Sequence, residues 1–114
     1  MPTGRQALGS HGEALAARWY EARGYDVVAR NWRIRDAELD LVMRRGGLLV
    51  FCEVKTRRDD RFGTAAEAVT PAKQRRVRRA AVAYLGASSE RPKQLRFDVA
   101  CVVGRQVDVI ESAF

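Results

Sequence analysis

Residues 38–58 read E-L-D-L-V-M-R-R-G-G-L-L-V-F-C-E-V-K-T-R-R. Two apolar runs, Glu38 to Met43 and Leu48 to Lys55, flank the pair Gly46-Gly47. Paired glycines tolerate the positive φ angles of tight turns, so the pattern predicts a β-hairpin. The second run ends with a glutamate and a lysine separated by one residue, which is unusual for a strand that is otherwise apolar.

Strand periodicity places the charged side chains of this hairpin on defined faces, because successive side chains alternate. On the second strand, one face carries Leu49, Phe51, Glu53 and Lys55. On the first strand, one face carries Glu38, Asp40 and Val42, and the other carries Leu39, Leu41 and Met43.

The length of the turn sets which residues are paired. A two-residue turn pairs Arg45 with Leu48, and counting outward places Asp40 opposite Glu53. By the same count, Glu38 falls opposite Lys55. A four-residue turn would shift the pairing by two and keep both acids on one face, whereas a three-residue turn would need a bulge to do so.

The pair of acids predicts a metal site. Directly opposed side chains have Cβ atoms about 4.5–5.5 Å apart, and carboxylates that close repel each other unless a cation lies between them. Asp40 and Glu53 would therefore suit Mg²⁺ or Mn²⁺, with water and phosphate oxygens completing the shell. Lys55 would stabilise charge on a phosphate or orient an attacking water. The alternative to a metal site is a set of cross-strand ion pairs on the solvent-exposed face of an antiparallel sheet.

Basic residues are concentrated in one part of the chain. Lys and Arg number 21 against 14 Asp and Glu, for a net charge of +7. The window from Lys55 to Arg79 holds nine basic and three acidic residues and accounts for +6 of that charge. Such a window favours a polyanionic partner, and it favours nucleic acid over an anionic membrane surface. The alternative is that these charges form a helix face that is simply exposed to solvent. The candidate nucleic-acid contacts are Arg57, Arg58, Lys73, Arg75, Arg76 and Arg79.

The remaining elements follow from periodicity, caps and turn residues. We expect a helix over Gly12–Arg23, a strand over Tyr25–Arg33, a basic loop over Thr56–Val69, a helix over Pro71–Leu85 capped by Thr70, and strands over Leu95–Val103 and Gln106–Glu111. The order predicts an α/β fold in which helices flank a central mixed five-stranded sheet.

Length and composition indicate one domain over residues 1–114, with residues 1–9 as a candidate disordered tail. No apolar run approaches the roughly 18 residues of a membrane span, and the first residues lack a signal-peptide core. No membrane contact and a cytoplasmic location are therefore the default expectations. Cys52 and Cys101 lie in apolar segments and are expected to be small core residues.

Several short motifs together resemble a known family. Asp40, followed after twelve residues by Glu53-Val54-Lys55, resembles the PD-(D/E)xK nuclease signature. Around it stand G-S-H-G-E at residues 9–13, N-W-R at 31–33, A-E-L-D-L-V at 37–42, F-C-E-V-K-T-R at 51–57, F-G at 62–63, Lys73, and R-F-D-V at 96–99. This set resembles the YraN-like family of uncharacterised bacterial proteins, which is similar to Holliday junction resolvases. The resemblance covers Gly9 to Phe114.

The resemblance implies a restriction-endonuclease-like core and assigns roles to the matching residues. It implies metal ligation by Asp40 and Glu53 and by the Val54 carbonyl, with Lys55 as the catalytic lysine. Glu13 resembles an additional acid of such sites, although an acid at a helix N-terminus is also favourable by itself. The chain departs from the family pattern at Leu39, which stands in place of the signature proline, and at Ala37, which stands in place of a glycine.

These expectations leave two main functions open. The first is a Mg²⁺- or Mn²⁺-dependent nuclease that hydrolyses phosphodiester bonds in structured or branched DNA. The second is a non-catalytic nucleic-acid binding module that retains a nuclease fold. A scaffold for a protein partner is a third candidate, which the lysine beside two acids disfavours. A two-fold junction as substrate would suit a homodimer.

Overall fold

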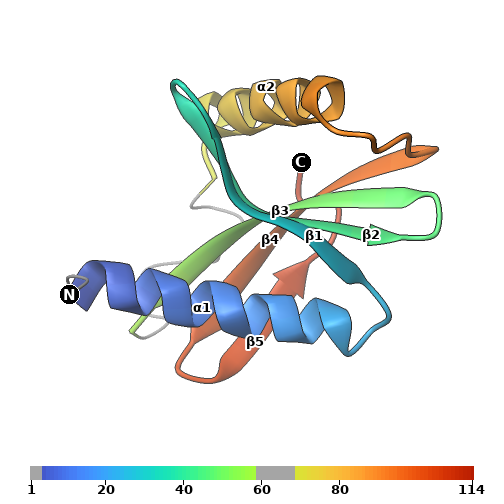
Figure 1. Ribbon diagram of the computed structural model, residues 1–114. Helices are drawn as coiled ribbons and strands as arrows, with labels where there is room; N and C mark the ends of the chain where they lie inside the picture. The colour runs from blue at the N-terminus through green and yellow to red at the C-terminus, as the bar shows by residue number, and fades with distance from the viewer. Residues whose placement is uncertain (1–3, 59–68) are drawn as a thin grey trace.

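Two helices and five strands make up the computed structural model, which describes residues 4–58 and 69–114 (Figure 1). In chain order they are α1 (Gly4–Glu21), β1 (Asp26–Ile34), β2 (Ala37–Arg45), β3 (Leu48–Arg57), α2 (Pro71–Ala87), β4 (Gln94–Val103) and β5 (Gln106–Ile110).

The strands form one sheet in the order β1-β2-β3-β4-β5. Neighbouring strands are antiparallel except for β3 and β4, which run parallel. A parallel pair needs a long crossover, and α2 lies in that connection. The predicted α/β architecture with a mixed five-stranded sheet is confirmed.

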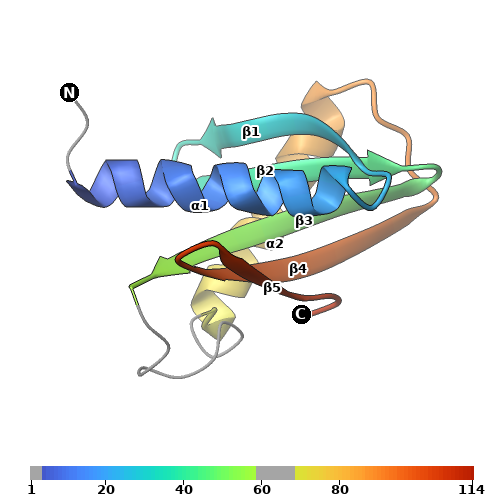
Figure 2. The ribbon, with the colours of Figure 1, turned by 90° about the horizontal axis from the view of Figure 1, so that it is seen from below.

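The helices cover opposite faces of the sheet. Figure 2 views the molecule with α1 in front of the strands and α2 behind them. Under α1 lies a core cluster that includes Ala16, Tyr20, Leu41, Met43, Val50 and Cys52. Under α2 lies a second cluster that includes Val42, Leu49, Phe51, Val77, Tyr84 and Phe97. The alternation expected for β3 is confirmed, because Leu49 and Phe51 face α2 while Val50 and Cys52 face α1.

The helices differ from the sequence expectations at their ends. α1 begins at Gly4 rather than Gly12, so residues 4–9 of the candidate tail lie in a helix, and residues 1–3 lie outside the described residues. Gly4 and Gly9 at the ends of this segment are poor helix formers and conceal the start of the helix. α2 begins as expected, with Thr70 accepting the Lys73 N–H at 3.2 Å. It passes Gly86 and ends at Ala87.

The basic loop expected over Thr56–Val69 is shorter at its start, because Thr56 and Arg57 belong to β3. Pairing of Thr56 with Val102 and of Arg57 with Val103 extends the strand past Lys55. Residues 59–68 of this expected loop lie outside the described residues.

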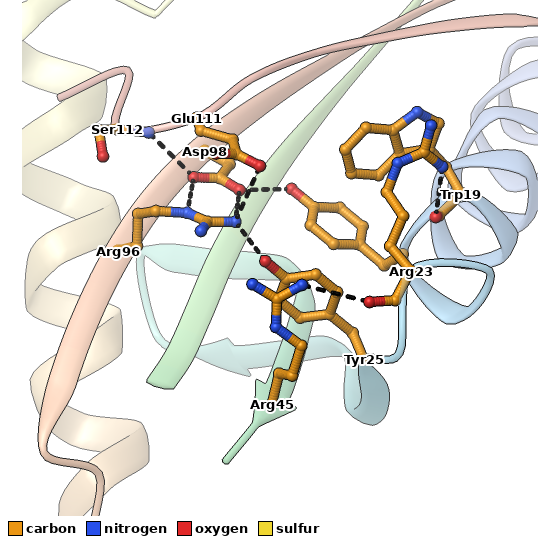
Figure 3. A network of polar contacts seen from close by, with 9 residues as sticks. Trp19, Arg23, Tyr25, Arg45, Arg96, Asp98, Glu111 and Ser112 are labelled. Atoms are coloured by element: carbon orange, nitrogen blue, oxygen red, sulfur yellow. Dashed lines mark hydrogen bonds and ion pairs between the residues drawn. The ribbon is translucent and has the colours of Figure 1, made fainter. Parts of the chain in front are cut away.

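A buried polar network joins α1 to β4 (Figure 3). The fully buried carboxylate of Asp98 accepts a hydrogen bond from the Tyr20 hydroxyl at 2.7 Å and two from the Arg96 guanidinium at 2.9 Å. The Ser112 N–H donates to the same carboxylate at 3.1 Å, and Arg96 also donates to the Tyr25 hydroxyl at 3.0 Å. Both carboxylate oxygens have partners, which compensates the buried charge and fixes α1 against the sheet.

Candidate functional site

The β2–β3 hairpin has the predicted register near its turn. Arg45 pairs with Leu48, and the ladder continues to Leu41 and Cys52. It ends there, one step before the expected pairing of Asp40 with Glu53. The reason is local, because the Val54 N–H donates to Oδ2 of Asp40 at 2.8 Å. A side-chain carboxylate thus takes the place of a main-chain acceptor.

Beyond Asp40 the two strands have different partners. β2 stays paired with β1 as far as Ala37 and Ile34, whereas β3 stays paired with β4 as far as Arg57 and Val103. The β1–β2 turn and the end of β3 therefore diverge, as both views of the ribbon show (Figures 1 and 2). Asp40 and Glu53 lie at the point of divergence.

Glu53 is the most unusual side chain in this region. It is 2% exposed, and its Oε1 has no hydrogen-bond partner among the described residues. Burial first, and then the neighbouring Asp40 carboxylate, raise the pKa of Glu53 to about 8. Lys73 and Lys55 oppose this rise, and the Lys73 Nζ lies 3.8 Å from Oε1. These surroundings disfavour a Glu53 carboxylate that no nearby cation compensates.

Faces on β2 are not those predicted from simple alternation. Leu41 packs in the α1-side cluster, but Leu39 joins Val42 in the α2-side cluster, so the expectation that Leu39 shares a face with Leu41 was wrong. On β1, Asn31 lies between the residues paired with these two leucines and has a φ of 50°. This left-handed residue interrupts the regular alternation of the strand pair beside Asp40.

Glu13 lies on α1 close to this irregularity. The pKa of Glu13 is raised overall, mainly by burial. A hydrogen bond with Asn31 lowers it, and the charges of Asp40 and Glu38 add to the rise. Glu13, Asn31, Glu38 and Asp40 line a surface hollow of about 500 Å³. The structure thus places Glu13 near Asp40, and it adds Glu38 to the same hollow.

A close contact between α1 and β3 sets this position. A Cβ atom on Gly12 would lie 1.9 Å from the Thr56 Oγ1. Only a glycine lets the helix approach the strand this closely. The G-E pair at the start of the expected helix thus combines a close approach with the acid that follows it.

The donor set fits a hard divalent cation at Asp40 and Glu53. Two neighbouring carboxylates, one with a buried oxygen that has no hydrogen-bond partner in the described part of the chain, match the one or two carboxylates that Mg²⁺ uses alongside water. Among residues 4–58 and 69–114, no three Asp, Glu, His or Cys side chains converge as a metal-binding group. Glu13 is thus not gathered with the pair, and further ligands would be water, phosphate or main-chain oxygens. Val54, the residue whose carbonyl the resemblance implies as a ligand, lies between Glu53 and Lys55.

The candidate nucleic-acid contacts lie on two elements beside the acids. Arg57 is half-buried near the end of β3, and the exposed Arg58 follows it. On α2, Lys73 lies next to Glu53, and the arginines are exposed, namely Arg75, Arg76, Arg78 and Arg79.

Two of these arginines contact other parts of the chain. Arg79 forms an ion pair with Asp36 at 2.6 Å. The Arg78 guanidinium lies over the Phe97 ring, 4.6 Å from its centroid.

Sequence reasoning missed Arg33 and Arg35, which line a second cavity together with Lys73 and Arg76. No local signal would have found them as a group, because the β1–β2 turn meets α2 only through the fold. The N-W-R motif at residues 31–33 lies in β1 shortly before this turn, and the sequence indicated no role for the turn.

Comparison with known proteins identifies the family. The profile of "Uncharacterised protein family UPF0102" matches residues 12–102. The chain belongs to this family. A UPF0102 protein of Rhodococcus opacus is 49% identical over 113 residues, which cover 95% of this chain and 96% of that protein. A UPF0102 protein of Nocardia farcinica is 52% identical over 99 residues, covering 87% and 78%, respectively.

A UPF0102 protein of Symbiobacterium thermophilum is also 52% identical, over 92 residues that cover 81% of this chain and 78% of that protein. The range that the family profile matches spans Glu13, Asp40, Glu53 and Lys55. The expected membership of the YraN-like family is confirmed. Within the described residues, neither helix has the length and apolar character needed to cross a bilayer.

Proposed function

We propose that this UPF0102 protein is a Mg²⁺- or Mn²⁺-dependent nuclease that hydrolyses phosphodiester bonds in structured or branched DNA. The observation that carries the proposal is the Asp40–Glu53 pair at the divergence of β2 and β3. Burial and mutual repulsion raise the pKa of Glu53 to about 8, and its Oε1 lacks a hydrogen-bond partner among the described residues. A divalent cation would relieve both conditions.

The lysines beside the pair supply the other requirements of phosphodiester hydrolysis. Lys55 follows Glu53 by two residues on β3 and would stabilise the charge that develops on the phosphate. Lys73 reaches the same region from α2 and would hold a phosphate oxygen. A bound divalent cation would add Lewis-acid polarisation of the phosphate. Attack of water at phosphorus then breaks one P–O bond and leaves a phosphate monoester and a hydroxyl group.

The exposed arginines and the diverging strands suit an extended polyanion. Arg58, Arg75 and Arg76 would contact backbone phosphates on both sides of the acids, since Arg58 follows β3 and the other two lie on α2. We propose that the protein acts in the cytoplasm on DNA. A homodimer would present two such sites to a two-fold junction, and light scattering with and without junction DNA would test that assembly.

The test is a metal-dependent cleavage panel. Chelator-treated protein is incubated with labelled single-stranded, duplex, flapped and four-way DNA, and with matching RNA, before and after addition of Mg²⁺ or Mn²⁺. Asp40→Asn and Lys55→Ala should each lower the cleavage rate by about 100-fold or more, because each removes a group that holds the cation or stabilises transition-state charge.

Matched controls lie at the opposite end of the sheet and its connections. Asp26→Asn removes an exposed acid at the start of β1, and Lys93→Ala removes an exposed lysine before β4. Both should keep the wild-type rate. Equal cleavage by wild type and both site variants would overturn the proposal. So would metal-independent DNA binding without cleavage of any substrate and without Mn²⁺ binding by calorimetry, which would favour the non-catalytic binding module.

A further inference from the structure

A second cavity lies beside the candidate site, between the β1–β2 turn and the first half of α2. It has a volume of about 290 Å³. Its charged lining residues are Arg33, Arg35, Asp36, Glu38, Lys73 and Arg76. In Figure 1 the turn approaches the start of α2, and the ion pair between Asp36 and Arg79 joins these two segments.

The acids of this cavity are already paired, whereas two of its arginines are not. Asp36 lies 2.6 Å from Arg79, and Glu38 lies 3.5 Å from Arg33. Within the described part of the chain, neither Arg35 nor Arg76 has an ion-pair partner. The cavity therefore has an excess of positive charge, contributed by Arg35, Arg76 and Lys73.

Lys73 connects this cavity to the acid pair. It lines the cavity, and its Nζ lies 3.8 Å from the Glu53 Oε1. A group bound in the cavity would thus be next to the phosphate that a cation at Asp40 and Glu53 would bind. Guanidinium groups bind phosphate oxygens through paired N–H donors, and two of them beside an ammonium group match a tetrahedral dianion or a phosphodiester.

We propose that this cavity binds the backbone phosphate adjacent to the scissile phosphate on the cleaved strand, with Arg35 and Arg76 as its principal contacts. The proposal rests on the proposed function and deepens it, because it assigns a substrate subsite to residues of the β1–β2 turn. It makes the β1–β2 turn a positioning element that fixes which phosphodiester bond reaches the acids.

Binding without metal tests the cavity separately from catalysis. Fluorescence anisotropy of a fluorescein-labelled four-way DNA junction is measured in EDTA over a range of salt concentrations. The double variant Arg35→Gln/Arg76→Gln should bind about tenfold more weakly, and the slope of log K against log salt should decrease by about 1. The control Arg23→Gln/Arg91→Gln removes the same charge from exposed positions outside this cavity and should retain the wild-type slope.

Cleavage of modified strands then locates the phosphate. Single uncharged methylphosphonates are placed in turn at each position near the cut. The wild type should lose rate when the neighbouring phosphate is replaced, and the double variant should be insensitive at that position. Wild-type binding and salt slope in the double variant would overturn the proposal. Inorganic pyrophosphate could also bind the wild type but not the double variant while both proteins bind DNA equally well. That result would assign the cavity to a free anion and would also overturn the proposal.

The two proposals fail differently. If the protein cleaves no substrate, the anisotropy in EDTA still reports whether Arg35 and Arg76 bind a DNA phosphate. If cleavage depends on Asp40 and Lys55 but the double variant binds and cuts like the wild type, the nuclease proposal stands and the subsite proposal falls. Circular dichroism of each variant verifies its fold.

Discussion

Replacement of Glu53 by glutamine should stabilise the metal-free protein in a pH-dependent way. Folding raises the pKa of Glu53 from 4.5 to about 8, so the folded state binds this proton more tightly than the unfolded state does. The free energy of unfolding therefore falls as the pH rises from 4.5 to about 8 and then levels off. Glutamine has nearly the same shape and stays neutral, so Glu53→Gln escapes this loss.

The size of the effect follows from the pKa change. One pKa unit corresponds to about 1.4 kcal/mol, so full ionisation of Glu53 costs at most about 5 kcal/mol of unfolding free energy. Above pH 8 we expect Glu53→Gln to be more stable than the wild type by between about 2 and 5 kcal/mol, and near pH 4.5 the two proteins should be equally stable.

Urea unfolding followed by circular dichroism in EDTA, at both ends of this pH range, measures the difference. Glu21→Gln is the matched control, because Glu21 is an exposed acid at the end of α1, and it should show no such pH-dependent gain. With Mn²⁺ at 100 times its dissociation constant, the wild type should gain about 2.7 kcal/mol, and the Glu53→Gln variant should gain much less. A stability difference between variant and wild type that does not change with pH would refute the reasoning.

Three further predictions concern the packing that supports the site. Gly12→Ala should cost about 1–3 kcal/mol of unfolding free energy in urea, because its Cβ would lie 1.9 Å from the Thr56 Oγ1; the double variant with Thr56→Ala should recover part of this loss, and no recovery would contradict the contact. Asp98→Ala should cost about 3–5 kcal/mol, since it leaves the Arg96 guanidinium without its buried partner, and a thermal melt close to wild type would show that the network contributes little. Thr70→Ala should cost about 1 kcal/mol through loss of the α2 N-cap, and a chemical denaturation midpoint equal to that of wild type would argue against this capping role.

Much of the fold could be predicted because local patterns determine it. The Gly46-Gly47 turn and its register, the Thr70 cap and the alternation along β3 are set by residues close in sequence. The parallel pairing of β3 with β4 was not specified, because it depends on how α2 packs between strands distant in sequence.

The candidate site could be predicted as a set of residues but not as a geometry. The proximity of Asp40 to Glu53 followed from the turn, yet the end of the ladder did not, because the Asp40 side chain takes the Val54 N–H. The face predicted for Leu39 was wrong because one left-handed residue on β1, Asn31, interrupts the alternation of side chains in the β1–β2 pair. The cavity at Arg35 arises from the tertiary contact of a turn with a helix, which periodicity along one strand does not encode.

The change of partner along β3 also has a consequence for the order of folding. As far as Cys52, β3 pairs with β2, which adjoins it in sequence, but the residues from Glu53 to Arg57 pair in the described sheet only with β4. The β1–β2–β3 meander can form from a short nascent chain, whereas the pairing of residues 53–57 with β4 must wait for residues up to 103. We therefore expect Lys55 and the end of β3 to be fixed late in folding, after the crossover through α2 has closed, whereas the hydrogen bond from Val54 to Asp40 needs only the hairpin.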